Sequence, residues 1–455
     1  MGSANTSKYE QYEKKFTSEG LPKDEQGWLA RAKEVSVILS EDAAQRDIDN
    51  ASPANEIQLL KSAGLLKILG PTAYGGGGQH WNVGFKVIRE VAKGDGSLGA
   101  LLGYHLQWST ATNVVGTDEQ RDRIQKEIIQ KNWFIGGAVN PRDADLHITL
   151  DGDELVYNGF KHFNTGGVIS DATVLEGVLQ GTDDHIFAIV PTRQPGIQFS
   201  HDWDNVGLRL TESGSVKIEN VRARWADALG WDPQTRKPIE SILKIPFASL
   251  LLPTIQLVFA NFYIGIAQGA LDYAAKWTKT KTRAWPFGGD NKSSPLDEFY
   301  ILSRYGNFQA HLLAAEALAD RAGDQLSSVY AEHSQKRDLT ARRRGEVAEW
   351  VASVKIVATD TGLRVSNGVF EVTGARSTAR KVGLDRFWRD IRTHTLHDPV
   401  AYKERELGRF LLLDEVSKIF VLSFSILPLI SLPPTYARTF VPSLPSTPVP
   451  NNLFK

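Results

Sequence analysis

The densest group of titratable side chains in the sequence lies near its C-terminal end, where His394 and His397 are followed by Asp398. Imidazole titrates near neutral pH and both donates and accepts hydrogen bonds, so this group suits acid–base work or the holding of a reactive oxygen. A metal site needs converging ligands, and Pro399 disfavours helix at Asp398, which turns that carboxylate elsewhere. We therefore expect acid–base or hydrogen-bonding chemistry and no metal ion. A structural turn in which both histidines are hydrogen-bonded within the protein accounts for the same residues.

A second candidate is a run of cations that precedes the histidines. Its members are Arg376, Arg380, Lys381, Arg386, Arg389 and Arg392. A solvated helix face is the default interpretation of such a run, but the preceding segment, 372–375, is rich in Thr and Gly and forms helix poorly, so an irregular loop is the other interpretation. Guanidinium groups on a loop bind phosphate in a bidentate manner.

Three weaker candidates lie earlier in the chain. His105 sits in an apolar stretch, where a lone histidine is usually a core residue with satisfied nitrogens. Thr165, in the segment 163–167, follows a predicted strand and would turn a hydroxyl toward whatever lies beside it. The four glycines at 75–78 are preceded by no apolar strand and followed by no Lys-Ser/Thr pair, so a connector is favoured over a phosphate loop.

Composition narrows the chemistry that these residues can carry. The chain has 455 residues and no cysteine, which excludes disulfides, thiol nucleophiles, Cys-ligated zinc and iron–sulfur clusters. Lys and Arg number 52 against 53 Asp and Glu, a net charge of −1, so no global field favours nucleic acid or an anionic membrane. No apolar signal segment opens the chain, and prolines interrupt the uncharged stretch 419–437. We expect a soluble, cytoplasmic protein.

The elements that must position these residues follow an α, then β, then α order. Helical patterns are expected at 53–63, 83–92 and 118–130, and again at 250–277, 296–330 and 344–365. Strands are expected at 133–139, 147–150, 154–157, 172–179, 185–190 and 215–218, with a hairpin at Asp151-Gly152. Separate helical and strand regions predict an α+β fold. We divide it into a helical domain (25–131), a β domain (132–238), a helical domain (239–415) and a Pro-rich irregular tail (416–455).

Six segments in order resemble the acyl-CoA dehydrogenase superfamily over about residues 25–415. They are Pro71–Gly76, Gly136–Pro141, Asn158–Thr165, Gly207–Arg209, Thr282–Gly288 and Arg389–Arg392. The resemblance implies an N-terminal helical domain, a β-barrel-like middle domain and a C-terminal four-helix bundle. The α–β–α order found above agrees with it.

The C-terminal motif indicates which branch of the superfamily the chain resembles. The dehydrogenase branch carries Tyr-Glu-Gly-Thr, whose Glu removes the substrate α-proton; here the aligned residues are His397-Asp398-Pro399-Val400. The segment 393–403 instead looks like the flavin-dependent monooxygenase branch, closest to the dibenzothiophene monooxygenases. This implies an enzyme that takes reduced FMN from a separate flavin reductase. It would insert one oxygen of O2 into an apolar aromatic or heteroaromatic substrate through a flavin C4a-hydroperoxide. The alternative is an acyl-CoA dehydrogenase or oxidase that uses FAD with Asp398 as base.

The resemblance also implies roles for particular residues. His105 and His397 match positions beside the flavin C4a atom, and Thr165 and Asp398 are expected to share in catalysis with them. The expected cofactor contacts are Asn140 and Thr165 at the isoalloxazine, Arg283 and Arg376 at the phosphate, and His394. Because a residue of the Arg283 type often reaches a flavin shared between subunits, a homotetramer is implied.

Overall fold

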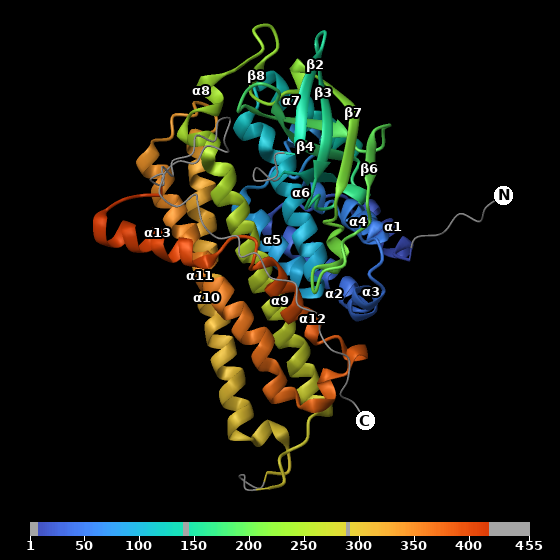
Figure 1. The fold of residues 1–455 in the computed structure, drawn as a ribbon. Helices are drawn as coiled ribbons and strands as arrows, with labels where there is room; N and C mark the ends of the chain where they lie inside the picture. The colour runs from blue at the N-terminus through green and yellow to red at the C-terminus, as the bar shows by residue number, and fades with distance from the viewer. Residues whose placement is uncertain (1–7, 140–144, 288–291, 418–455) are drawn as a thin grey trace, which may run out of the picture.

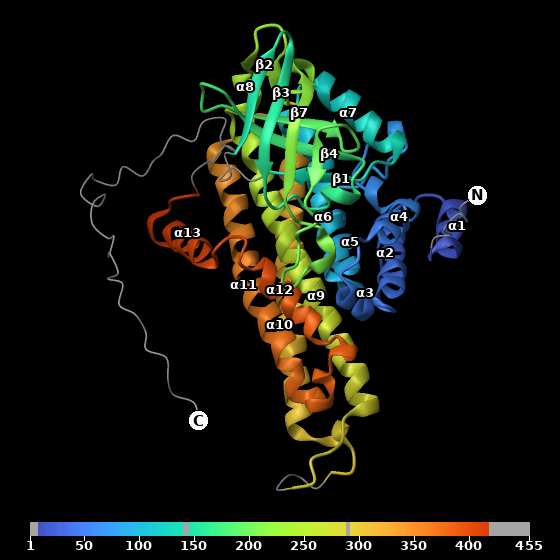
Figure 2. The ribbon, with the colours of Figure 1, turned by 45° about the vertical axis from the view of Figure 1, so that its right-hand side comes forward.

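The structure, a computed structural model, describes residues 8–139, 145–287 and 292–417. The strands gather at one end of the molecule, and three long helices run side by side away from them (Figures 1 and 2). The helices of the first third of the chain lie beside both.

The N-terminal third is helical. Its helices are α1 (Glu10–Glu19), α2 (Glu25–Ser40), α3 (Ala43–Asp49), α4 (Ala54–Ser62), α5 (Trp81–Gly94), α6 (Gly96–Val115) and α7 (Asp118–Lys131). Local sequence explains their ends: Thr117 and Gln120 form a reciprocal capping box at the start of α7, and Asn132 ends it in the left-handed conformation. The predicted helices at 53–63, 83–92 and 118–130 are confirmed, with Pro53 at the N-cap position of α4 and not at its first helical position.

The middle of the chain forms one mixed seven-stranded sheet. Its strands are β1 (Ile135–Ala138), β2 (Leu146–Asp151), β3 (Glu154–Lys161), β4 (Ala172–Leu179), β5 (His185–Pro191), β6 (Ile197–Phe199) and β7 (Val216–Arg224), in the order β1-β4-β2-β3-β7-β6 with β5 on β4. The predicted hairpin joins β2 to β3, where Gly152 has a φ of 59°. One edge of β4 pairs with β1 near its start and with β2 near its end, whereas its other edge pairs with β5. A two-stranded ribbon, β8 (Trp231–Asp232) and β9 (Lys237–Pro238), follows.

The C-terminal third is again helical. It contains α8 (Glu240–Leu243), α9 (Leu251–Lys281), α10 (Phe299–His333), α11 (Ala341–Thr373), α12 (Asp385–His394) and α13 (Val400–Leu413). The long α9 packs against α5, α6, α10, α11 and α12, so it is the central helix of the molecule. The domain limits predicted at 131/132 and 238/239 fall just after α7 and β9, and the division itself stays a prediction.

Of the two interpretations of the arginine run, the structure shows a helix for three of its members. Arg386, Arg389 and Arg392 lie on the helix α12 and not on an irregular loop. The weak helix formers at 372–374 fall where α11 ends, and a new helix begins at Asp385 after two short 3-10 turns. The break that the sequence indicates is real, but it is short.

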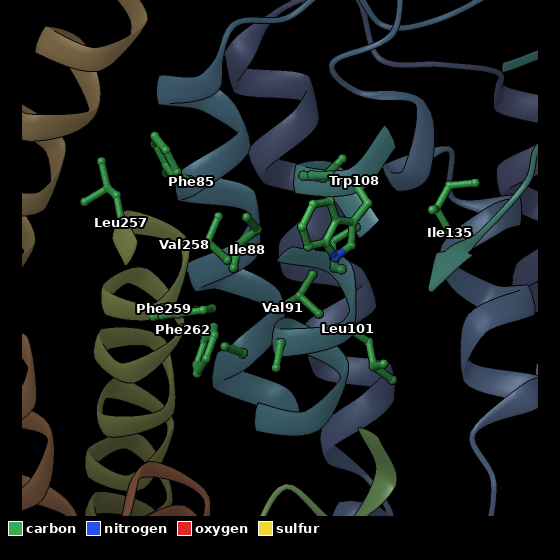
Figure 3. Close-up of a cluster of buried hydrophobic side chains, with 14 of the residues drawn as sticks. Phe85, Ile88, Val91, Leu101, Trp108, Ile135, Leu257, Val258, Phe259 and Phe262 are labelled. Carbon is green, nitrogen blue, oxygen red and sulfur yellow. The ribbon is translucent and has the colours of Figure 1, made fainter. Parts of the chain in front are cut away.

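The core lies where α5, α6 and α9 meet. Figure 3 shows buried apolar side chains of these helices, among them Phe85, Ile88, Trp108, Val258 and Phe259. Of the described residues, one helical segment, Pro246–Lys281, is long and apolar enough to cross a membrane, but 89% of its apolar window is buried inside the protein. That is the position of a core helix. The predicted tail, 416–455, lies outside the described residues apart from Val416 and Ser417.

Candidate active site

His394, the last residue of α12, lies at the centre of a buried polar cluster. Its ring is held between two tyrosine hydroxyls: Tyr263 on α9 is 2.7 Å from Nδ1, and Tyr104 on α6 is 3.1 Å from Nε2. The rings of Phe259 and Phe262 pack around it, with centroids 4.4 Å and 4.8 Å from the His394 ring. Residues from three parts of the chain therefore meet at this imidazole.

Burial sets the protonation states in this cluster. Burial, followed by the nearby His397 and Lys355, holds the pKa of His394 well below 6.5, so the ring is neutral near pH 7. Burial also raises the pKa of the Tyr104 and Tyr263 hydroxyls, which keeps both protonated. A neutral imidazole carries one N–H and one bare nitrogen. Each tyrosine hydroxyl can accept a hydrogen bond from the N–H or donate one to the bare nitrogen.

His397 lies on the solvent side of the same cluster. Its ring stacks on that of His394, with centroids 5.3 Å apart and planes 6° apart. The side chain of His397 is 53% exposed, whereas His394 is 8% exposed. The two histidines that the sequence singles out are thus together, but only His397 is open to a small molecule from outside.

Asp398 is held in an ion pair. Its Oδ1 lies 2.9 Å from the Lys355 ammonium on α11, and Gln256 Nε2 donates to its Oδ2 at 3.3 Å. Burial alone would raise the pKa of this carboxyl, but hydrogen bonds from His397 and Lys355 and their charges outweigh it and hold the pKa well below its usual value. A carboxylate so stabilised is a weak base.

Thr165 lies in a tight loop after β3. Its hydroxyl bonds to that of Ser213 at 2.9 Å, and Ser213 bonds to Thr211 at 2.8 Å. The next residue, Gly166, has a φ of 69°, and a Cβ there would come within 3.1 Å of Leu101 on α6. Since Leu101 is one helical turn before Tyr104, this loop lies close to the His394 cluster.

His105 is buried and bonded to the backbone through both ring nitrogens. It has no exposed surface; its Nε2 bonds to the Leu66 carbonyl at 2.9 Å, and its Nδ1 accepts the Ile135 N–H at 3.0 Å. Burial lowers the pKa of His105 to about 4. Because both ring nitrogens serve the backbone, neither is free to hold a ligand, and this arrangement is that of a core histidine.

The expected phosphate contacts lie far from this cluster. Arg283 follows the end of α9, and Arg376 donates to the carbonyl of Lys281 there; both side chains are exposed. Lys281 is eighteen residues of helix beyond Tyr263, which is about 27 Å. One chain therefore does not bring these arginines to its own His394. Asn140, the other expected flavin contact, lies outside the described residues.

Three further arginines of the run have structural partners. Arg389 pairs with Asp47 and Asp385, Arg386 donates to the Gly383 carbonyl, and Arg392 donates to Thr395. The Arg389–Asp47 pair fixes α12 to α3, whereas the other contacts are made to residues of α12 itself or of the segments just beside it.

Four residues of the cluster were missed by sequence reasoning. They are Tyr104, Gln256, Tyr263 and Lys355. Tyr104 stands next to His105 and was passed over for it. A lysine on α11 and a tyrosine within the apolar pattern of α9 carry no local signal, because their partners lie 43 and 131 residues away in sequence.

Comparison with known proteins gives the class first. The acyl-CoA dehydrogenase N-terminal domain matches residues 32–132, and the acyl-CoA dehydrogenase C-terminal domain matches residues 257–401. These two helical domains flank the central sheet described above, so the class defined by fold and site is that of the acyl-CoA dehydrogenases.

Individual relatives are more specific. A dibenzothiophene monooxygenase of Mycolicibacterium goodii is 36% identical over 391 residues, covering 84% of this chain and 92% of that protein. A probable FMNH2-dependent monooxygenase, SfnC of Pseudomonas putida, is 35% identical over 389 residues, covering 85% and 95%. The structure of TdsC from Paenibacillus sp. A11-2 with FMN and indole has a TM-score of 0.80 at 31% identity, covering 87% of this chain and 100% of that one. The chain therefore belongs to the acyl-CoA dehydrogenase family, in the group of the dibenzothiophene monooxygenases.

Proposed function

We propose that this chain is the oxygenase of a two-component flavin-dependent monooxygenase. It would use reduced FMN from a separate flavin reductase to insert one oxygen of O2 into a small apolar aromatic or heteroaromatic substrate. The observation that carries this proposal is the state of Asp398. It occupies the place of the dehydrogenase base, yet it is bound to the buried Lys355 ammonium and to Gln256. The site therefore offers a weak base and a neutral imidazole, together with hydroxyl donors.

The residues around the Thr165 loop suit a flavin ring. Phe163, two residues before Thr165, has a left-handed backbone and is 58% exposed, and its ring meets that of Trp203 edge-on at a centroid distance of 6.3 Å. A planar apolar ring system with polar edges fits such a surface. The exposed guanidinium of Arg376 suits a phosphate. When bound, reduced FMN supplies the activation of O2.

The distance between the Tyr263–His394 cluster and the arginines at the end of α9 supports an oligomer. About 27 Å of helix lies between Tyr263 and the end of α9, farther than a single FMN reaches. One FMN would thus take ring contacts from one protomer and phosphate contacts, from Arg283 and Arg376, from a second copy. Exposed apolar side chains near the same end, Trp285 at 59% and Phe299 at 76%, support a face covered by another copy. We infer a homotetramer that works in the cytoplasm.

The protein's own residues would manage protons and water. His397, half exposed beside the buried His394, can donate a hydrogen bond to a reacting oxygen, and the Thr165 hydroxyl can do so from the loop. The aromatic rings of Phe259 and Phe262 exclude water from the inner side. Losing one such donor in a dry site costs about 3 kcal/mol, or about 100-fold in rate.

The competing function is oxidation of an acyl-CoA with FAD, using Asp398 as base. The ion pair with Lys355 disfavours it, because removing an α-proton needs a base whose pKa is raised and not lowered. A carboxylate with a buried ammonium 2.9 Å away has the opposite environment.

The deciding experiment supplies chemically reduced FMN and isotopically labelled O2 with dibenzothiophene or indole as probe. We expect a product that gains one labelled oxygen, and no bleaching of bound FAD by butyryl-CoA. In His397→Ala, FMN binding should persist while hydrogen peroxide release rises at the expense of product. Absence of labelled product together with acyl-CoA-dependent bleaching would refute the monooxygenase and establish the alternative.

A further inference from the structure

A continuous chain of hydrogen bonds crosses the protein from α11 to α6. Lys355 Nζ lies 3.1 Å from the Tyr263 hydroxyl, which lies 2.7 Å from His394 Nδ1, and His394 Nε2 lies 3.1 Å from the Tyr104 hydroxyl. We propose that these four side chains form a proton path from the Lys355 ammonium to the Tyr104 hydroxyl, with Tyr263 as its indispensable link. The inference rests on the proposed function, since it names how the same site receives a proton.

The first requirement of such a path is that it can reverse. A lysine ammonium only donates, so its hydrogen bond to the Tyr263 oxygen has one direction. The Tyr263 proton, however, has two acceptors: His394 Nδ1 at 2.7 Å and the His394 backbone carbonyl at 3.1 Å. When Tyr263 donates to Nδ1, Nε2–H donates to Tyr104. When Tyr263 turns to the carbonyl, Nδ1–H donates to Tyr263 and Tyr104 donates to Nε2, so both ring nitrogens of His394 keep a partner in both states.

The second requirement is a proton source at one end. Lys355 has no exposed surface, and burial lowers the pKa of its ammonium despite the neighbouring Asp398 carboxylate. Each group in the path passes on one proton and receives one, except Lys355, which only gives one. An N–H of Lys355 gives its proton to Tyr263, Tyr263 gives its own to Nδ1, Nε2–H passes to Tyr104, and Tyr104 releases its proton beyond. Lys355 ends as a neutral amine, and Asp398 remains a carboxylate.

The third requirement is that the path opens where the reaction occurs. Tyr104 lies one turn after Leu101, which touches Gly166 in the loop proposed to hold the flavin. Among the described residues, His394 is the one hydrogen-bond partner of the Tyr104 hydroxyl. The hydroxyl therefore keeps the capacity for one further hydrogen bond. At the opposite end of the path, solvent reaches the half-exposed His397. The Nδ1 atom of His397 is 3.4 Å from the Asp398 oxygen that Lys355 also contacts, so a proton from solvent can return to Lys355 on this side.

A purely structural hydroxyl on the same helix provides the comparison. Tyr273 on α9 donates to the Val382 carbonyl at 3.0 Å and belongs to no such chain. Tyr273→Phe removes a hydroxyl from α9 just as Tyr263→Phe does. Both substitutions keep the ring, so differences between the two variants report on the path and not on packing.

The first readout uses the flavin-free protein with ¹⁵N-labelled histidine, the His394 signals being assigned with His394→Asn. In the wild type and Tyr273→Phe, we expect both ring nitrogens at shifts averaged between protonated and bare values. In Tyr263→Phe, Nδ1 loses its partner, and we expect one fixed tautomer with the proton on Nε2. A wild-type His394 held in one tautomer that Tyr263→Phe leaves unchanged would overturn the proposal.

The second readout uses reduced FMN, O2 and dibenzothiophene. Since proton transfer by a positioned group contributes about 100-fold or more, Tyr263→Phe should lower product formation by about that factor and shift oxygen use toward hydrogen peroxide, with FMN affinity unchanged. Lys355→Arg separates charge from proton supply, because arginine keeps the positive charge but does not release a proton. If Lys355 is the proton source, Lys355→Arg should lose product formation to the same extent as Lys355→Met, which removes the charge as well.

The outcomes distinguish the two proposals. If the wild type forms no oxygenated product, the proposed function fails, whereas the tautomer measurement still decides whether the path exists. If the wild type oxygenates the probe and Tyr263→Phe matches Tyr273→Phe in product yield, the path is refuted alone. Full activity in a folded Lys355→Arg protein would likewise remove Lys355 as the source.

Discussion

The buried His105 makes a sharp prediction about pH. Its neutral ring accepts the Ile135 N–H and bonds to the Leu66 carbonyl, and burial lowers its pKa from 6.5 to about 4. In the unfolded chain the ring binds a proton near pH 6.5, whereas in the folded protein it does not until about pH 4. The contribution of His105 to stability is therefore present above pH 6.5 and is lost as the pH falls toward 4.

The size of the effect follows from the two pKa values. A shift from 6.5 to about 4 makes the free energy of unfolding about 2.5 kcal/mol smaller at pH 4.5 than at pH 7.5. His105→Gln keeps a donor and an acceptor but has no titratable group, so it should lack this loss. His394, whose pKa is also lowered, and Asp390, whose pKa burial raises to about 7, act in both proteins and cancel in the difference.

Hydrogen exchange at the Ile135 amide is the suitable assay, since that amide donates directly to His105 Nδ1. Its opening free energy, corrected for intrinsic exchange, should fall by about 2.5 kcal/mol more in the wild type than in His105→Gln between pH 7.5 and 4.5. Parallel curves for the two proteins would refute a neutral, structural His105. Product formation by His105→Gln at pH 7.5 should stay within about threefold of wild type, whereas a catalytic His105 would lose about 100-fold.

Three further predictions concern the ion pair, the phosphate and the oligomer. Asp398→Asn should cost about 3 kcal/mol of stability by leaving Lys355 unpaired, and adding Lys355→Met should recover most of it; additive losses in thermal melts would contradict this. Arg376→Ala should weaken FMN binding about tenfold in a fluorescence titration without changing the melting temperature, and equal weakening by the exposed neighbour Arg380→Ala would show a non-specific charge effect. Phe299→Asp should dissociate the tetramer in light scattering, and an intact tetramer would exclude this face as the interface.

Much of the fold could be predicted because its signals are local. The hairpin at Asp151-Gly152 needs only turn chemistry, and the capping residues of α7 lie within four positions of one another. The helix α12 was missed because its beginning at Asp385 depends on contacts with distant elements. Arg389, for example, holds α12 to Asp47, 342 residues away in sequence.

The candidate site likewise has a part that the sequence could predict and a part that it could not. Adjacency in sequence brought His394, His397 and Asp398 into one group, and the structure keeps them together. It separates them from Arg283, because a straight helix carries the end of α9 about 27 Å from Tyr263. Whether the two ends meet at one flavin depends on a second chain, which no property of a single sequence segment encodes.

By itself, the sequence determined the kinds of chemistry open to this protein. Without cysteine, the chain has only nitrogen and oxygen groups to offer beside a bound cofactor, and its α–β–α order follows from local hydrophobic periods. Tertiary structure decided which groups can act. Burial and partners make His105 a core residue, tie Asp398 to Lys355, and link Tyr263 to His394, because protonation and hydrogen bonding depend on neighbours in space and not on neighbours in sequence.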